Sequence, residues 1–323
     1  MDDPVQVLKQ VETALEHWSL KPLAIDVVSQ SENIVYKVTA AEGTFAFRIH
    51  RPGYHTLDEL NAEQEWTDAL TRGGFRLPTT LPTASGARYL PVQVNGGTRY
   101  AGVIEWLNGS TMKDLTDGEP THEVRYQQLR VLGELMAKLH NHATTWQPSD
   151  TFIRHHLDVD GFFGASPFWG RYWESPAIQP DQRALLLKTQ ISIADRLHQL
   201  GQDGDDFGMI HADLHEGNVF ISDAKMYLID FDDAGFGWYL YDIAVALYQY
   251  HFENDYRLFE SAFLEGYTHN RPLTDAHKNL LPMFLHIRSR ALIGWATARP
   301  ELEKQALIDH LIQKTCQEAF SYA

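Results

Sequence analysis

Two short polar motifs, joined by a strand–turn–strand pattern, constrain the fold of this 323-residue chain more than any other feature. The first motif, HADLHEGN, is residues 211–218, and the second, IDFD, is residues 229–232. Two β-prone runs with a Ser-Asp turn between them separate the motifs, which predicts a hairpin. Because antiparallel strands bring their outer ends together, we expect Asp213, Asn218 and Asp230 to converge at the open end of this hairpin.

The three side chains of this set suit a hard cation. Two carboxylates and an amide oxygen are ligands that Mg²⁺ accepts, with water and substrate phosphates completing its shell. An Asp shortly before a metal-binding Asn, with a metal-binding Asp one hairpin later, is the arrangement of kinase phosphoryl transfer. The alternative is that these residues cap a hairpin and its turns, as Asp and Asn often do. Two motifs in the right order and at the right spacing argue against that alternative.

Together the two motifs resemble those of the aminoglycoside phosphotransferase and choline kinase-like superfamily, which includes type II homoserine kinases and bacterial stress-response kinases. That superfamily carries His-x-Asp-x-x-x-x-Asn followed by Ile-Asp-Phe/Trp-Asp, and this chain has both. The resemblance implies an α+β, protein kinase-like two-lobe fold, with a five-stranded antiparallel sheet in the N-lobe. We expect the nucleotide-binding N-lobe at residues 1–107. A mainly helical C-lobe with the catalytic loop, metal site and acceptor pocket is expected at residues 108–323.

The resemblance also implies roles for the motif residues. Asp213 is the expected catalytic residue, which positions an acceptor hydroxyl and accepts its proton, while Asn218 and Asp230 hold Mg²⁺ on the phosphates of ATP. Two positions depart from the protein kinase pattern, because Ala212 replaces the Arg of His-Arg-Asp and Asp232 replaces the Gly of Asp-Phe-Gly. From the roles of Asn218 and Asp230, the expected cofactors of this phosphotransferase are ATP and Mg²⁺.

One charged pair is expected in the N-lobe. Arg48, in the third β-prone run, takes the place of the kinase lysine that pairs with the α- and β-phosphates, and arginine keeps the charge. Glu63, on the following helix, is the expected partner of Arg48, with Glu59 and Glu65 as rivals. The alternative is that Arg48 and Glu63 are ordinary surface residues.

Two further N-lobe segments are expected to meet the nucleotide. The turn that contains Ser29 and Ser31 lies where a kinase-like fold places its phosphate-covering loop, and it has no glycine. At the end of the last N-lobe strand, the backbone groups of Glu105 and Leu107 would meet the adenine edge at the hinge between lobes. An ordinary turn or strand end would have the same sequence pattern.

Charge, hydropathy and cysteine content restrict the partners. The formal net charge of −16 disfavours nucleic-acid binding, which depends on neutralising phosphates with Lys and Arg. No apolar run reaches about eighteen residues, so no membrane span is expected. The single cysteine, Cys316, cannot form an internal disulfide, and we expect a cytoplasmic protein. The oligomeric state stays open.

The segment between Asp230 and Asp242 favours a small acceptor. It is too short for the activation segment and Ala-Pro-Glu element with which regulated protein kinases hold a peptide. The expected acceptor is therefore a small-molecule hydroxyl of amino acid, amino sugar or amino alcohol type. One alternative is a Ser/Thr protein kinase of the stress-response type, and another is a nucleotide-binding module without catalysis.

Other C-lobe residues leave their roles open. The aromatic-rich segment at residues 152–173 predicts either a hydrophobic segment docked on the helical lobe or the lining of an acceptor pocket. Arg288 and Arg290 could reach an anionic acceptor group, although solvation at the surface is the expectation for each. By resemblance, Asp242 accepts backbone hydrogen bonds from the catalytic loop, and His140 is a structural residue at a helix end.

Overall fold

The computed structural model describes most of the chain, and the following statements concern the residues that it describes. These are residues 4–30, 33–94, 96–115, 121–202, 204–223 and 225–319. The chain divides into two compact units. Unit 1 comprises Met1–Ser110, Pro148–Ile153 and Phe220–Ile229, and unit 2 comprises Thr111–Gln147, Arg154–Val219 and Asp230–Ala323. The lobe boundary expected after residue 107 stays a prediction.

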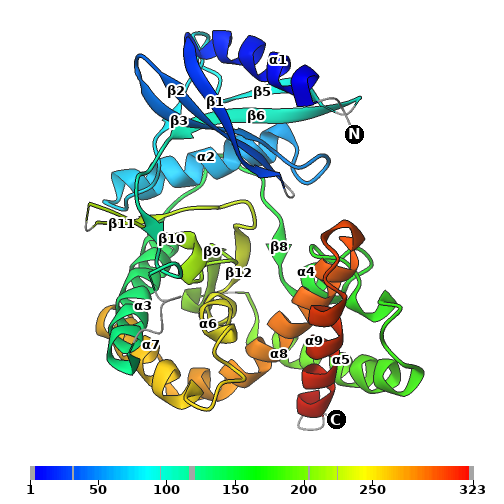
Figure 1. Ribbon diagram of the computed structural model, residues 1–323. Helices are drawn as coiled ribbons and strands as arrows, with labels where there is room; N and C mark the ends of the chain where they lie inside the picture. Colours follow the sequence, from blue (N-terminus) through cyan, green and yellow to red (C-terminus); the bar gives the residue numbers. More distant parts are fainter. Residues whose placement is uncertain are drawn as a thin grey trace. The chain divides into compact units, whose positions relative to one another are not determined.

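Unit 1 is built on an antiparallel sheet with strand order β1-β2-β3-β6-β4, in which β5 also pairs with β6 (Figure 1). The strands are β1 (Pro22–Gln30), β2 (Ile34–Ala40), β3 (Gly43–Ile49), β4 (Thr80–Leu81), β5 (Tyr89–Val94) and β6 (Gly97–Glu105). The expected sheet had five strands; the sixth, β4, is two residues long and lies in the Pro-containing connection after the helix. The expected antiparallel sheet of an α+β fold is confirmed.

Helix α1 (Pro4–Leu15) and the 3₁₀ turn η1 (Glu16–Trp18) cover one face of this sheet (Figure 1). Val7, Val11 and Ala14 recur at helical spacing and are buried against the strands. Trp18 closes the end of this core, since its ring packs edge-on against Phe47 with the centroids 6.0 Å apart. Burial of each such valine side chain contributes about 1.5–3 kcal/mol.

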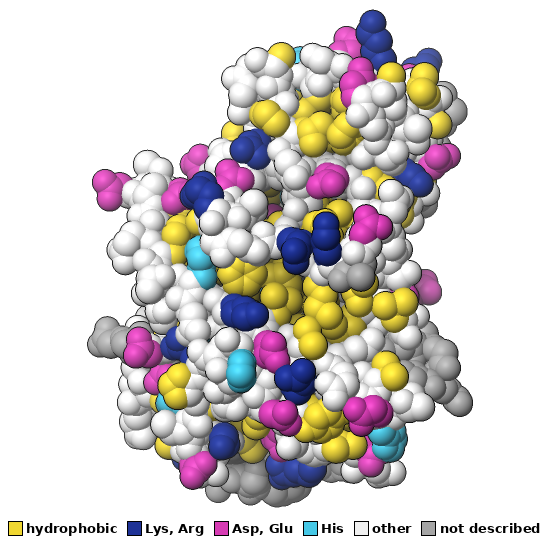
Figure 2. Space-filling view, turned by 90° about the vertical axis from the view of Figure 1, so that its left-hand side faces the viewer, with side chains coloured by type: hydrophobic (Ala, Val, Ile, Leu, Met, Phe, Trp, Pro, Cys, Tyr) yellow, Lys and Arg dark blue, Asp and Glu magenta, His cyan; other side chains and the backbone are white. Residues whose placement is uncertain are grey.

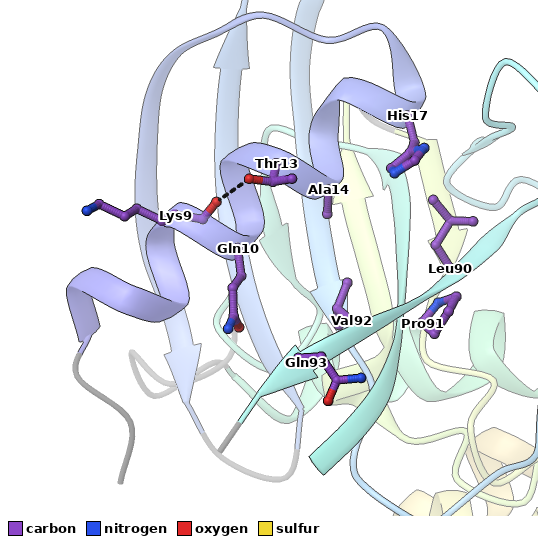
Figure 3. Close-up of a pocket in the computed structure, with 9 residues that line it drawn as sticks. All are labelled: Lys9, Gln10, Thr13, Ala14, His17, Leu90, Pro91, Val92 and Gln93. Carbon is purple, nitrogen blue, oxygen red and sulfur yellow. Dashed lines mark hydrogen bonds between the residues drawn. The ribbon is translucent and has the colours of Figure 1, made fainter. Parts of the chain in front are cut away.

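A surface pocket of about 630 Å³ lies between α1 and β5 (Figure 3). Lys9, Thr13 and His17 line its helical side, and the Thr13 hydroxyl donates to the Lys9 carbonyl at 2.9 Å. Leu90 and Val92 contribute to its strand side. Its described lining residues include none of the side chains that the sequence assigns to catalysis, so the pocket is separate from the expected chemistry.

Helix α2 (Leu57–Arg72) begins at a capping box and carries the expected partner of Arg48. The Glu59 N–H donates to the Thr56 hydroxyl at 3.2 Å, and the Thr56 N–H donates to Glu59 Oε2 at 2.7 Å. Trp66 and Leu70 are fully buried on the same helix. The cap fixes the helix start, and with it the place of Glu63 in the second turn.

Unit 2 is mainly helical. Its helices are α3 (His122–Thr145), α4 (Val159–Phe163), α5 (Pro180–Leu200), α6 (Tyr239–Tyr248), α7 (Tyr256–Asn270), α8 (Asp275–Thr297) and α9 (Gln305–Ala319), with 3₁₀ turns η2 (Tyr172–Glu174), η3 (Gly204–Asp206), η4 (Glu216–Asn218) and η5 (Pro300–Leu302). The short strands β8 (His156–Leu157), β12 (Gly235–Trp238) and β9 (Phe207–Ile210) form a sheet in that order.

The boundary between the two units crosses two short strands, β7 (Ser110–Thr111) and β10 (Val219–Ser222). The expected hairpin is present, because β10 pairs with β11 (Lys225–Leu228).

Two glycines let α3 and α7 pack side by side with their backbones in contact (Figure 1). A Cβ added at Gly266 would lie 1.8 Å from the Arg130 carbonyl oxygen, and one added at Gly133 would lie 2.1 Å from the Phe263 carbonyl oxygen. Any larger side chain at either position must push the two helices apart.

Charged side chains of both signs are interspersed on the face shown in Figure 2, and neither sign forms a continuous field there. Within the described ranges, no helix is both long and apolar enough to cross a membrane.

Candidate active site

The backbone of the catalytic loop is held by one buried carboxylate. The N–H groups of His211 and Ala212 donate to Oδ2 and Oδ1 of Asp242 at 3.0 and 2.7 Å, respectively. Asp242 is completely buried in α6 and also contacts His140 Nε2 at 3.1 Å. The expectation that Asp242 accepts backbone hydrogen bonds from this loop is confirmed. Ala212 has a left-handed backbone (φ 64°), a strained conformation that the surrounding contacts must maintain.

His140 supports Asp242 as a neutral ring. Burial lowers the pKa of His140, although the hydrogen bond to Asp242 opposes this effect. Its Nδ1 lies 2.8 Å from the Tyr267 hydroxyl. Since the carboxylate is an acceptor, the proton of the neutral ring lies on Nε2, and the Tyr267 hydroxyl donates to Nδ1. His140 is therefore a structural residue, as expected.

Both oxygens of the Asp213 carboxylate accept hydrogen bonds within unit 2. Arg288 Nη2 donates to Oδ1 at 2.6 Å, and Asn218 Nδ2 donates to Oδ2 at 3.1 Å. His215 Nε2 lies 3.5 Å from Oδ2. The Asp213 side chain is 27% exposed, so it remains accessible to a second molecule.

The protonation state of Asp213 follows from these neighbours. Burial alone would raise the pKa of Asp213, but the hydrogen bond from His215 and the charge of Arg288 outweigh it and hold the pKa well below its usual range. Burial alone would lower the pKa of Arg288, but the Tyr241 hydroxyl and Asp213 raise it. Asp213 is therefore ionised, and Arg288 is its cationic partner.

The orientation of Asn218 leaves its amide oxygen for another ligand. Its Nδ2 donates to the Asp213 backbone oxygen at 2.9 Å as well as to the Asp213 carboxylate. Because both neighbours are acceptors, only the NH₂ group of the amide can face them, and the oxygen must point the other way. The same loop is fixed by His215, whose Nδ1 accepts the Gly217 N–H at 3.0 Å. This arrangement fits an amide oxygen that binds a cation.

Asp230 follows β11 directly and has a left-handed backbone (φ 65°). This conformation is uncommon for a residue other than glycine and is concentrated at functional sites. No cluster of three or more His, Cys, Asp or Glu side chains suited to a metal ion occurs among the described residues. The expected ligand set is of a different kind, the Asp230 carboxylate and the Asn218 amide. The structure joins Asp213 and Asn218, and the convergence of Asp230 with them stays a prediction.

Arg154 fixes the backbone that follows Asp230. It is 4% exposed, and its guanidinium donates to the carbonyl oxygens of Ala234, Phe231 and Asp232 at 2.6, 3.1 and 2.6 Å. The residue lies in an irregular aromatic segment of the sequence, where no periodicity distinguishes it. Because its partners are backbone atoms, no charge pattern could have predicted the contact.

The expectation that Arg288 and Arg290 are solvated is wrong, since they are 8% and 1% exposed. Charged residues are seldom buried unless they are paired, and both have partners in unit 2. Arg290 donates to the Tyr172 hydroxyl at 2.8 Å and the Thr189 hydroxyl at 2.6 Å. Arg288 pairs with Asp213, so it belongs to the candidate active site.

The aromatic segment is largely core. Phe162, Phe163, Trp169 and Tyr172 are at most 8% exposed. This agrees with a hydrophobic segment docked within the helical unit. Trp169 also contacts the candidate site, because its ring centre lies 5.9 Å from the Arg288 Cζ.

In unit 1, the expected Arg48–Glu63 pair stays a prediction, and the rivals of Glu63 have other partners. Arg48 lies on β3, and Glu63 is 9% exposed on α2. Glu59 caps its own helix through Thr56. Glu65 accepts hydrogen bonds from the backbone and the hydroxyl of Ser149 at 2.7 and 2.6 Å.

The remaining nucleotide-binding predictions concern two ends of the sheet. Ser29 was expected in a turn but lies within β1, and Ser31 lies outside the described residues. The Glu105 N–H donates to the Thr79 carbonyl at 2.8 Å, so this donor is engaged in the sheet. Contact of Glu105 and Leu107 with an adenine stays a prediction.

Three features define the class of this protein as the kinase-type phosphotransferases. They are the antiparallel sheet with α2, the mainly helical unit 2 and the Asp213–Asn218 pair. The family model described as the phosphotransferase enzyme family matches residues 25–279. The chain belongs to this family, which confirms the resemblance found in its motifs and makes the protein an enzyme of phosphoryl transfer.

Three known proteins show the range of this similarity. Amicoumacin kinase of Bacillus subtilis (strain 168) is 24% identical over 278 residues, which cover 83% of this chain and 78% of the relative. Homoserine kinase of Rhizobium johnstonii (strain DSM 114642 / LMG 32736 / 3841) is 30% identical over 222 residues, which cover 66% of this chain and 61% of the relative. The solved structure of a microcompartment-associated aminopropanol kinase has a TM-score of 0.79 and 26% identity, and the match covers 97% of this chain and 94% of that chain. The protein kinase-like fold class is confirmed.

Proposed function

We propose that this protein transfers the γ-phosphoryl group of ATP to a hydroxyl group of a small molecule that also carries an amine. The observation that carries this proposal is the fixed, ionised carboxylate of Asp213, which is accessible and hydrogen-bonded to Asn218. Similarity to amicoumacin, homoserine and aminopropanol kinases supports an acceptor of the amino alcohol or amino acid type.

Each residue has one task in the proposed reaction. Mg²⁺, when bound, neutralises charge on the phosphates, and Asn218 Oδ1 with Asp230 would hold it. Asp213 orients the acceptor hydroxyl. As the acceptor oxygen bonds to the γ-phosphorus, the bond from that phosphorus to the bridging oxygen breaks. The bridging oxygen keeps the bonding electrons and leaves as part of ADP, and the hydroxyl proton passes to Asp213. A carboxylate with a depressed pKa is a weak base, so this residue contributes chiefly through orientation.

The nucleotide is assigned to residues 1–107. Arg48, held by Glu63, would bind the α- and β-phosphates, because a guanidinium matches phosphate geometry. Ser29 and Ser31 would approach the phosphates, and the backbone of Glu105 and Leu107 would meet the adenine.

The test is transfer of label from γ-labelled ATP in the presence of Mg²⁺. L-Homoserine, 1-amino-2-propanol, choline and an aminoglycoside serve as separate acceptors. Transfer to at least one is expected, with loss in Asp213→Asn and no loss in the exposed control Asp150→Asn. A parallel assay adds labelled ATP and the enzyme to a cell lysate. Label that enters proteins of the lysate and none of the small acceptors would favour a protein kinase. Absence of both phosphoryl transfer and ATP hydrolysis would overturn the proposal and favour a nucleotide-binding module.

A further inference from the structure

The guanidinium of Arg288 contacts one oxygen of Asp213, while Asn218 holds the other. Arg288 comes from α8, 75 residues further along the chain, and its Nη2 lies 2.6 Å from Asp213 Oδ1. The Asn218 amide lies 3.1 Å from Oδ2. A carboxylate held at both oxygens cannot rotate about its Cβ–Cγ bond without losing a charge-assisted hydrogen bond. Its orientation is therefore fixed before any substrate binds.

The aromatic ring of Trp169 contacts Arg288 in turn. The Arg288 Cζ lies 5.9 Å from the centre of this ring, within the range of a cation–π interaction. Trp169 is itself anchored, because its Nε1 donates to Asp233 Oδ2 at 3.0 Å. Trp169 is 4% exposed, so it is not accessible to a dissolved acceptor. Any influence of Trp169 on the reaction must pass through the residues that it contacts, Arg288 and Asp233.

An ion pair that only stabilised the fold would not need to include the candidate catalytic residue. Here one partner is the carboxylate that the motif assigns to catalysis, and that partner is 27% exposed while the arginine side chain is 10% exposed. A buried guanidinium needs an anionic partner. The pair therefore presents its negative member, Asp213, outward and keeps its positive member, Arg288, behind it.

We propose that Arg288 is a positioning residue for phosphoryl transfer: it holds Asp213 so that a fixed carboxylate oxygen meets the acceptor hydroxyl, and Trp169 keeps Arg288 in place. This inference rests on the proposed function, since it requires Asp213 to meet the acceptor. Arg288 touches neither substrate, so its loss changes turnover and leaves ATP binding intact. Lysine is a poor substitute, because an ammonium lacks the planar fork and its fixed donor directions.

The test compares kcat and KM for wild type, Arg288→Lys, Arg288→Ala and Asp213→Asn. The substrates are Mg·ATP and the one acceptor, among the four tested for the proposed function, that gives the highest rate. If none is phosphorylated, the assay measures ATP hydrolysis, with water as the acceptor. Arg288→Ala is expected to lower kcat by about 100-fold with KM for ATP nearly unchanged, because small misplacements of a catalytic group have effects of this size. Added guanidinium ion, at millimolar concentration, is expected to restore part of the rate in Arg288→Ala and none in Asp213→Asn.

Arg290→Lys is the matched control, because Arg290 is buried on the same helix and bonds to Tyr172 and Thr189 instead. It is expected to lower the midpoint of thermal unfolding while kcat of the folded enzyme persists, and guanidinium ion has no effect on it. At Trp169, the Trp169→Leu variant is expected to lower kcat more than Trp169→Phe, which keeps an aromatic ring next to Arg288. These two variants also serve if Arg288→Ala does not fold.

The outcomes separate this inference from the proposed function. Absence of both transfer and hydrolysis in wild type would remove the proposed function itself. An active wild type and inactive Asp213→Asn, with full kcat in Arg288→Ala, would overturn the role of Arg288 alone. A raised KM for the acceptor at unchanged kcat would also overturn it, since Arg288 would then bind the acceptor directly.

Discussion

The Oδ1 atom of Asp242 accepts the N–H of Ala212 at 2.7 Å, across 30 residues of chain. This contact ties the start of α6 to the residue that immediately precedes the candidate catalytic carboxylate. Ala212 adopts its left-handed backbone here (φ 64°), a conformation that costs roughly 1–3 kcal/mol and that the carboxylate helps to stabilise. The position of Asp213 therefore depends on a residue that is itself fully buried.

Asp242→Asn is expected to lower the free energy of unfolding by about 3 kcal/mol. The amide has one acceptor atom for the two N–H groups of His211 and Ala212, and hydrogen bonds to a charged group contribute about 1.5–3 kcal/mol each. Urea unfolding followed by circular dichroism measures the change. Asp275→Asn, at a side chain that is 95% exposed, is the control and is expected to change little. Equal stability of the two variants would contradict the role of Asp242.

Asp213→Ala is expected to lower turnover by about 100-fold or more and to leave ATP affinity nearly intact. Its carboxylate orients the acceptor in the proposed reaction and does not bind the nucleotide. Steady-state kinetics with labelled ATP measure turnover, and calorimetry with a non-hydrolysable ATP analogue measures affinity. Near-normal turnover would exclude Asp213 from catalysis.

Asp230→Ala is expected to abolish the Mg²⁺ dependence of nucleotide binding. Removing a carboxylate ligand leaves the ion with one amide oxygen and the phosphates, which weakens its retention. Calorimetric titrations with the ATP analogue, with and without Mg²⁺, detect the change. Asp150→Ala at an exposed position is the control, and it should behave as wild type. A Mg²⁺ effect of wild-type size in Asp230→Ala would remove this residue from the metal site.

Gly266→Ala is expected to destabilise the protein by about 2 kcal/mol or more. Alanine is favoured over glycine by about 1 kcal/mol in a helix interior, but the added Cβ would lie 1.8 Å from the Arg130 carbonyl oxygen, and overpacking outweighs the gain. Gly97→Ala is the control, since the nearest atom to its Cβ would be 3.9 Å away. Chemical denaturation compares the two, and a stabilised Gly266→Ala would show that α3 and α7 can separate without cost.

Stability is expected to fall as the pH falls from about 6.5 to about 4, because of His286. Arg290 Nη2 donates to its Nε2 at 3.0 Å, so the proton of the neutral ring lies on Nδ1, 3.8 Å from Glu318 Oε2. Burial lowers the pKa of His286 to about 4, although Glu318 opposes this effect. The unfolded chain therefore binds a proton before the folded chain does, and the folded state loses on the order of 3 kcal/mol across this range.

The measurement for His286 is the free energy of unfolding at several pH values. His286→Gln is expected to have a weaker pH dependence than wild type between pH 6.5 and about 4. The exposed His198→Gln is the control and should keep the wild-type slope. Parallel curves for wild type and His286→Gln would contradict the assignment.

Local patterns in the sequence were sufficient for the fold class and for part of the site. Leu129, Leu132 and Leu139 recur at the helical spacing that predicts an amphipathic helix, and the structure has α3 at His122–Thr145. The spacing of the two motifs predicted the β10–β11 hairpin, and the contact of Asp242 followed from the family resemblance. Strand β4 was missed because two residues in a Pro-containing connection show no alternation.

Contacts between distant segments could not be predicted in this way. Arg288 looked like a solvated residue because charged side chains are rarely buried, and nothing in a single sequence links it to Asp213 75 residues earlier. Arg154 binds backbone oxygens, which have no sequence signature at all. The Arg48–Glu63 pair illustrates the same limit, since helix periodicity allows several acidic residues to face one strand.

Because Arg154 donates to main-chain oxygens, the side chains of the turn after Asp230 can change without loss of its hydrogen bonds. Its hydrogen bonds end on the carbonyls of Phe231, Asp232 and Ala234, atoms that every amino acid supplies. Mutations that exchange the side chains of this turn therefore leave its anchoring intact. Side chains next to Asp230, the expected metal ligand, can therefore change while these three hydrogen bonds persist.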